Sequence, residues 1–155
     1  MSTEQSPLHA TQTFFASRAA GWEDRFAQDG PQYARAVTEL APPPGATVLD
    51  LGCGTGRALP FLRTAVGPNG QVIGLDATWE MLQEAQRLGR RAVAHLWQGD
   101  VLQLPLPDAC CDVIFAGGLL PHLADGAAAG LRAMARVSRP GARLAVFHPI
   151  GRVAL

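Results

Sequence analysis

One stretch of the chain, residues 47–57 with the sequence TVLDLGCGTGR, constrains the fold more than any other. It begins with a short apolar run that predicts a buried strand of a parallel sheet, formed by Val48, Leu49 and Leu51. A helical pattern follows, and between the two lie three glycines at alternate positions, Gly52, Gly54 and Gly56. A strand that enters a helix through a glycine-rich turn allows the backbone to approach a bound nucleotide closely. The stretch therefore predicts an α/β fold with a ligand site at this turn.

The rest of the chain repeats the alternation of strand and helix. Further runs of strand length lie at 71–76, 93–98, 111–116 and 143–148. Helical patterns lie at 58–66, 79–88 and 125–137, the last with Asp125 as a candidate N-cap. A proline-bearing loop at 102–109 and a turn at 138–141 fill two of the connections. Strands that alternate with helices through short connections predict right-handed crossovers and a doubly wound parallel sheet.

The 155 residues are enough for a single hydrophobic core, so we expect one domain. Residues 1–13 are polar, show no apolar period, and are expected to be disordered or frayed. The domain is then 14–155, with a helical segment at 14–41 and a core at 47–149.

The helical segment carries an aromatic face made of Phe14, Phe15, Arg18, Trp22 and Phe26. Gly30-Pro31 interrupts it, and 33–40 is predicted to form a second short helix. Aromatic residues at helical spacing are usually core, which favours an amphipathic pair packed on one end of the sheet. The alternative is a lid over the ligand, with Trp22 or Arg25 reaching inward.

Composition excludes several classes of function. Thirteen basic and thirteen acidic residues give a net charge of zero, and their scattered distribution argues against a nucleic-acid interface. The three cysteines, Cys53, Cys110 and Cys111, are odd in number and two are adjacent, which predicts neither a disulfide framework nor a metal site. No signal peptide and no apolar run of membrane-spanning length is present. We therefore expect a cytoplasmic protein.

Three acidic residues follow the first three predicted strands. Asp50 lies within the first strand, Asp76 ends the second, and Asp100 lies just beyond the third. In open α/β sheets, ligands bind outside the carboxyl ends of the strands. Asp76 is well placed to accept both hydroxyls of a ribose, and Asp100 to accept from an adenine amino group while the backbone of Val101 pairs with a ring nitrogen. The pattern predicts an adenosine site.

The glycine spacing distinguishes between adenosine compounds. A dinucleotide fingerprint requires G-x-G-x-x-G, but the position of the last glycine is occupied by Arg57. The pattern here is G-x-G-x-G, with the carboxylate of Asp50 two residues before it. A pyrophosphate would meet that carboxylate unfavourably, whereas the ammonium and sulfonium of S-adenosylmethionine would not. The sequence therefore favours S-adenosylmethionine.

Five segments in order, DLGCGTG, GLDAT, QGD, LPLPDACCDVIF and ARVSRPGARLAVFHP, resemble the class I S-adenosylmethionine-dependent methyltransferases. The resemblance covers roughly residues 14–149 and is strongest to the small-molecule branch that includes the ubiquinone and menaquinone biosynthesis type. It implies a Rossmann-like sheet in the methyltransferase strand order. It also implies in-line transfer of a methyl group to a small-molecule acceptor, with S-adenosylhomocysteine as the product.

The resemblance also implies a set of cofactor-binding residues. The methionine end of the cofactor would be held chiefly by backbone contacts of the first motif, with the residues Asp50, Gly52, Cys53, Gly54 and Gly56. Asp76 would bind the ribose, Ala77 and Met81 would contact the adenosine, and Asp100 and Val101 would bind adenine. Ala116 and Gly117 would line the methionine side.

Two histidines follow the fourth and fifth strands and are candidates for a general base, His122 first and His148 second. A base is needed only where the proton of the nucleophile must leave early, and packing or loop hydrogen bonding is the alternative for each. His95 and the cysteines are expected to be structural.

The resemblance further implies two strands after the fifth, the last antiparallel, whereas the sequence ends seven residues after His148. We expect either a truncated domain or a minimal version. In both cases the fifth strand is an exposed apolar edge that favours a homodimer or poor solubility. Two other functions stay open: a non-catalytic module that binds S-adenosylmethionine and, less favoured, a nicotinamide-dependent oxidoreductase.

Overall fold

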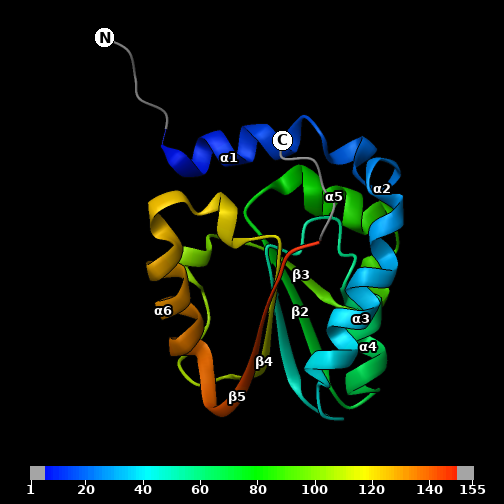
Figure 1. The fold of residues 1–155 in the computed structure, drawn as a ribbon, viewed down its shortest axis with the longest axis vertical. Coiled ribbons are helices and arrows are strands. Elements are labelled where there is room, and N and C mark those ends of the chain that lie inside the picture. The colour runs from blue at the N-terminus through cyan, green and yellow to red at the C-terminus, as the bar shows by residue number, and fades with distance from the viewer. Residues whose placement is uncertain (1–5, 150–155) are drawn as a thin grey trace.

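A computed structural model of the protein describes residues 6–149, which form a five-stranded sheet between layers of helices (Figure 1). The strands are β1 (Thr47–Leu51), β2 (Gln71–Asp76), β3 (His95–Gln98), β4 (Cys111–Gly117) and β5 (Ser138–Phe147). They pair in parallel in the order β3-β2-β1-β4-β5. The predicted doubly wound parallel sheet is confirmed.

The helices are α1 (Pro7–Ala16), α2 (Trp22–Arg25), α3 (Gly30–Leu40), α4 (Leu59–Val66), α5 (Trp79–Arg87) and α6 (Ala127–Val137). Helices α3 and α4 pack on one face of the sheet, and α6 packs on the other (Figure 1). The remaining connections contain short 3-10 turns. No helix within residues 6–149 is long and apolar enough to cross a membrane.

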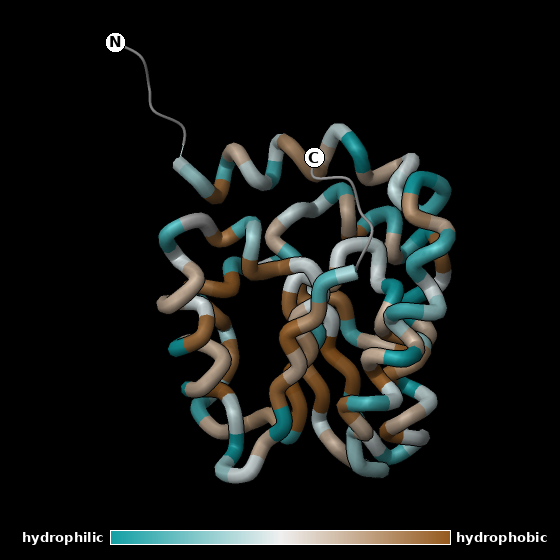
Figure 2. The backbone as a smooth tube through the Cα atoms, viewed as in Figure 1, coloured by the Kyte–Doolittle hydropathy of each residue, from teal (hydrophilic) through white to brown (hydrophobic). Residues whose placement is uncertain are grey.

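The central strands form the core because both faces of the sheet are covered. Successive residues of β1 point to opposite faces, so Val48 packs with α3 and α4 while Leu49 and Leu51 pack on the α6 side. Figure 2 shows the most hydrophobic residues along the strands in the middle of the sheet, as expected for a buried parallel sheet. The carboxyl ends of all five strands lie at one edge of the sheet, beneath α1 (Figure 1).

The prediction of a frayed N-terminus is wrong for residues 7–13, which belong to α1. Ser6 caps this helix, because its Oγ accepts a hydrogen bond from the backbone N–H of His9 (3.3 Å) and Pro7 occupies the first turn. Gln12 then donates from Nε2 to the backbone carbonyl of Ala77 (2.9 Å). These are capping and tertiary contacts, which an apolar period does not reveal. Residues 1–5 lie outside the described part of the chain.

The predicted aromatic helix face is also divided, because α1 ends at Ala16 and a 3-10 turn (Ala19–Gly21) separates it from α2. The predicted turn at 138–141 lies within β5, where it forms a bulge: Cys111 pairs with Ser138, but Val113 pairs with Arg143. Asp125 is not the N-cap of α6. That position belongs to Gly126, and the preceding 3-10 turn (Ala124–Gly126) contains Asp125.

Strand β5 forms an edge of the sheet, and its apolar residues Leu144 and Val146 are 46% and 49% exposed. The guanidinium of Arg143 donates to the backbone carbonyls of Leu40 (3.3 Å) and Ala41, which ties the strand to the end of α3.

Candidate active site

The turn between β1 and α4 is built from glycines in the left-handed backbone region. The φ angles of Gly52, Gly54 and Gly56 are +66°, +55° and +82°. The backbone N–H groups of Gly52 and Cys53 both donate to the carbonyl of Leu75 at the end of β2 (2.8 and 3.0 Å). The turn is therefore fixed to the neighbouring strand by main-chain contacts, which places it at the carboxyl edge of the sheet.

Asp76 links the end of β2 to this turn. Its Oδ2 accepts from the N–H of Gly54 (2.8 Å), and its Oδ1 accepts from the N–H of Thr78 (2.8 Å). Burial raises the pKa of Asp76, while these two hydrogen bonds act in the opposite direction. A carboxylate has about four acceptor sites, so Asp76 can accept further hydrogen bonds from ligand hydroxyls.

Asp50 lies deeper, at the end of β1, and is only 2% exposed. Burial, together with the negative charge of Asp76, raises its pKa to about 8 from an ordinary value of 3.8. Asp50 and Asp76 therefore form a pair of neighbouring carboxyl groups. Such a pair disfavours an anionic ligand group nearby and favours a cationic one. This electrostatic arrangement is unsuited to a pyrophosphate.

A cleft opens at the carboxyl edge of the sheet, between the strand ends and α1. The structure brings ten of the predicted site residues together in its lining: Gly52, Cys53, Gly54, Asp76, Ala77, Met81, Asp100, Val101, Gly117 and His122. Asp100 also caps the 3-10 turn Val101–Gln103, because its Oδ1 accepts from the N–H of Leu102 (2.9 Å).

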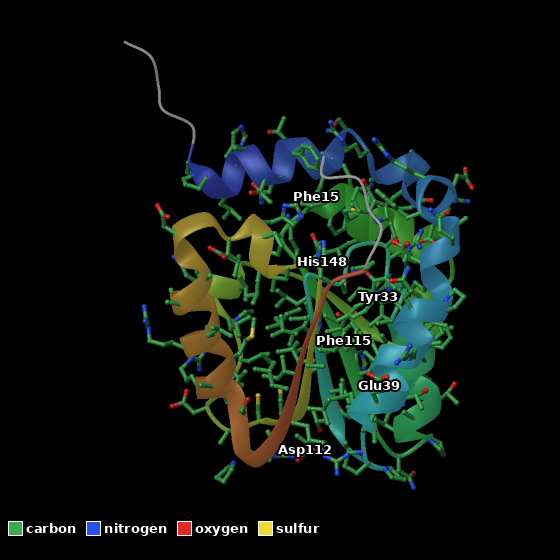
Figure 3. The ribbon with its side chains drawn as sticks, in the orientation of Figure 1. Phe15, Tyr33, Glu39, Asp112, Phe115 and His148 are labelled. Atoms are coloured by element: carbon green, nitrogen blue, oxygen red, sulfur yellow. The ribbon has the colours of Figure 1, made fainter. Side chains whose placement is uncertain are left out.

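Four predicted site residues do not line the cleft. Asp50 and Gly56 support the turn from within the fold, and Ala116 is fully buried in the core beside Leu49 and Leu51. The side chain of Ala116 therefore does not face the cleft, and its contact with the methionine side stays a prediction. His148 is exposed just after β5 and is not part of the lining either (Figure 3). Of the two candidate bases, the structure places His122 at the cleft.

The position of His122 depends on α1. It ends the 3-10 turn Leu120–His122 after β4, and its ring centroid lies 4.8 Å from that of Phe15 in an edge-to-face arrangement. Phe15 in turn contacts Trp22, with 5.4 Å between the ring centroids. Helix α1 and the loop after β4 therefore meet over the strand ends.

Sequence reasoning missed a second group of lining residues: Pro7, Leu8, Thr11, Phe15, Tyr33, Thr55, Arg57, Leu102, Leu119 and Leu123. Most belong to segments without a motif. The exceptions are Thr55, which lies within the glycine pattern, and Arg57, which follows it directly, so their positions were the available signal. Trp22 was predicted either to pack or to reach the ligand. It packs in the fold, being 8% exposed, and it also lines the cleft, so a contact with the ligand stays a prediction. Arg25, the other candidate, is exposed and outside the lining.

Comparison with known proteins agrees with this geometry. The profile of the methyltransferase domain matches residues 48–141, which is more than half of the chain. The chain belongs to the methyltransferase domain family.

Individual members of the family give the same result. The chain is 41% identical over 116 residues to 2-phytyl-1,4-naphtoquinone methyltransferase of Synechococcus elongatus, covering 72% of this chain and 49% of that protein. It is 36% identical over 111 residues to demethylmenaquinone methyltransferase of Desulfitobacterium hafniense, covering 69% and 44%. The chain thus spans about half the length, or less, of these relatives.

Among solved structures, a SAM dependent methyltransferase from Aquifex aeolicus superimposes with a TM-score of 0.72 at 27% identity, covering 83% of this chain and 70% of that one. The strand order and these matches together confirm the class I methyltransferase fold, and the predicted resemblance to quinone methyltransferases is confirmed by two of the relatives.

Proposed function

We propose that this chain binds S-adenosylmethionine and transfers its methyl group to a small-molecule acceptor. The observation that carries the proposal is the pair of carboxyl groups, Asp50 and Asp76, beneath a glycine turn that lacks the dinucleotide spacing. Membership of the methyltransferase domain family supports it independently.

The residues present fit this cofactor. Asp76 has acceptor capacity left for ribose hydroxyls, and Asp100 and Val101 lie at the neighbouring strand end for the adenine. The buried side chain of Met81 (2% exposed) offers an apolar surface for the adenosine. The cofactor supplies a methyl group that is already activated by the sulfonium. The protein therefore has to align the reactants and exclude water.

We further propose that the acceptor is largely apolar. The lining of the cleft includes five large apolar side chains: Leu8 and Phe15 of α1, and Leu102, Leu119 and Leu123. The guanidinium of Arg57, which also lines the cleft, is occupied by hydrogen bonds to the protein. The names of the two quinone methyltransferases support the same class of acceptor.

His122 is our candidate for a general base, because it lines the cleft beside Phe15. Replacement by alanine should lower the methylation rate at saturating cofactor without weakening cofactor binding. A His122→Ala variant with full turnover would remove it from this role.

Calorimetry separates the proposed function from its alternatives. S-adenosylhomocysteine should bind and NAD should not. Binding of NAD with comparable affinity would support an oxidoreductase instead. If S-adenosylhomocysteine binds but no methylated product forms from reduced short-chain demethylmenaquinone or a broad set of metabolites, the chain is a non-catalytic binding module.

Self-association through β5 is also a proposal. The edge strand exposes Leu144 and Val146, and such edges pair readily with another copy. Sedimentation should then detect a dimer that the Val146→Lys substitution disperses, and a wild-type monomer at high concentration would contradict it. Cytoplasm remains the expected compartment, since all three cysteines are free.

A further inference from the structure

Arg57 lies directly after the glycine turn and is one of the few buried charged residues, with a side chain only 7% exposed. Its guanidinium points to the N-terminal segment at residues 22–26, more than thirty residues away in sequence. There Nη2 donates to the carbonyls of Trp22 (3.3 Å) and Glu23 (3.0 Å), and Nη1 donates to the carbonyl of Phe26. Arg57 thus supplies donors to carbonyl groups in and just after a one-turn helix.

A second contact joins the same two segments. The carboxylate of Glu23 accepts from Nε of Arg57 (3.2 Å) and from the hydroxyl of Thr55 (2.5 Å) through the same oxygen. Thr55 is 1% exposed and lies within the glycine turn. Two side chains of the turn therefore hold one short segment of the N-terminal region.

That segment forms a wall of the cleft. Trp22 and Phe26 pack with Met81 of α5 and with Ala19 in a small cluster of buried residues. Trp22, Met81 and the turn residues Thr55 and Arg57 all line the cleft. The guanidinium consequently connects the glycine turn, which is one boundary of the cleft, to the aromatic wall that covers it.

We propose that Arg57 is a positioning residue that holds the segment 22–26 against the glycine turn, so that cofactor binding and closure of the N-terminal wall are coupled. The inference rests on the proposed cofactor. A lysine could not substitute fully, because an ammonium is a point charge, whereas the planar guanidinium donates in several fixed directions at once. Glu23 is the partner that completes the connection.

Arg57→Met tests the proposal, since methionine keeps much of the apolar volume and removes every donor. Arg63→Met is the matched control. Arg63 also donates to backbone carbonyls, those of Val93, Gly67 and Gly70 (each 2.9 Å), but it does not line the cleft. Glu23→Ala is a second variant that leaves the glycine turn unaltered. Each protein is measured for thermal unfolding, for S-adenosylhomocysteine binding, and for amide hydrogen exchange of residues 14–29 without ligand.

Arg57→Met should weaken S-adenosylhomocysteine binding about tenfold, mainly by faster dissociation, and should accelerate exchange in residues 14–29. Glu23→Ala should do the same to a smaller extent, and Arg57→Lys should restore part of the affinity. Arg63→Met should lower the unfolding temperature but leave both affinity and exchange of this segment unchanged.

Wild-type affinity in a folded Arg57→Met protein would overturn the proposal. Equal weakening by Arg63→Met at an equal loss of stability would also overturn it, because the effect would then be global. If the wild-type protein itself failed to bind S-adenosylhomocysteine, the proposed function would fail. Amide hydrogen exchange of residues 14–29 would still decide whether Arg57 holds the segment 22–26.

Discussion

The two halves of the cleft are built in different ways. The half formed by the glycine turn and the ends of β1 to β3 is fixed by the backbone, as in the contacts of the Gly52 and Cys53 N–H groups with the carbonyl of Leu75. The half formed by α1, α2 and the loop after β4 is held by side chains, such as the ring contact of Phe15 with His122 and the guanidinium of Arg57. The first half and the loop after β4 lie within residues 48–141, which match the family profile, whereas α1 and α2 lie outside that range. We expect substitutions in the first half to affect the cofactor directly. Those in the second should affect the acceptor, and should affect the cofactor only where they release the segment 22–26 from Arg57.

The largest effect is expected from Asp76→Ala in the backbone-held half. The substitution removes the acceptor of the Gly54 and Thr78 N–H groups as well as the proposed ribose contact. S-adenosylhomocysteine should bind at least about a hundredfold more weakly, as measured by calorimetry on protein whose folding is checked by circular dichroism.

Asp108→Ala is the control for this variant. The side chain of Asp108 is 77% exposed and pairs with Arg136 on the surface, away from the cleft. Its loss should change stability by about 1 kcal/mol or less and leave ligand binding unaltered. Binding by Asp76→Ala within about threefold of wild type would place the cofactor elsewhere.

The strand ends were predictable from sequence because their function depends on backbone geometry. Gly52 and Gly54 have positive φ angles, and Asp76 ends a buried strand, so local pattern alone identifies them. Ala116 shows the limit of this reasoning. A residue at a strand end points to one face or the other, and here it points to the core.

The half of the cleft that is held by side chains could not be predicted from the sequence in the same way. Helix α1 is stabilised by the cap at Ser6 and by the contact of Gln12 with Ala77, which no hydrophobic period encodes. The contact of Glu23 with Arg57 joins positions that only the folded chain brings together. Likewise, His122 and His148 both follow strands and are both exposed, and only the structure shows that His122 lines the cleft and His148 does not.

The next largest effect concerns Asp50, whose carboxyl group has a pKa of about 8 in the folded protein and an ordinary value of 3.8. Between these values the folded state binds one proton more than the unfolded state, so this group makes the free energy of unfolding fall as pH rises from about 4 to about 8. Asp50→Asn should flatten that dependence and stabilise the unliganded protein at pH 8 by on the order of 1–3 kcal/mol. Urea unfolding at pH 5 and pH 8 measures both.

The same group links binding to protons. The ammonium group of the bound ligand near Asp50 would favour the ionised form of this carboxyl group, so binding of S-adenosylhomocysteine at pH 7 should release protons. Calorimetry in buffers of different ionisation enthalpy measures the release, which Asp50→Asn should diminish. Identical release in the variant would show that Asp50 does not sense the ligand.

A smaller effect is expected in the side-chain-held half from Phe15→Leu. The substitution keeps an apolar residue at the cleft but removes the ring that contacts His122. The KM for reduced short-chain demethylmenaquinone should rise several-fold, and the affinity for S-adenosylhomocysteine should change by less than about twofold. Phe14→Leu is the control, because Phe14 packs under Arg18 and does not line the cleft. Equal effects of both variants, or a larger effect on the cofactor, would contradict the division of the cleft into two halves.

The smallest effect is expected at the opposite edge of the sheet, where a substitution should leave ligand binding in both halves of the cleft unaltered. Asp112 lies at the start of β4, where it accepts from the N–H of Thr47 (2.8 Å) and from Arg139 (2.8 Å). The hydrogen bond from the Thr47 N–H, and to a lesser extent that from Arg139, holds the pKa of Asp112 below its usual range. The group therefore stabilises the folded protein above its ordinary pKa, and this contribution is lost as pH falls through the lower, folded-state value. Asp112→Asn should lower the free energy of unfolding at pH 6 by roughly 1 kcal/mol or less, with a smaller difference at pH 3. Binding of S-adenosylhomocysteine should stay at the wild-type level, since Asp112 lies at the far ends of the strands from the cleft (Figure 3).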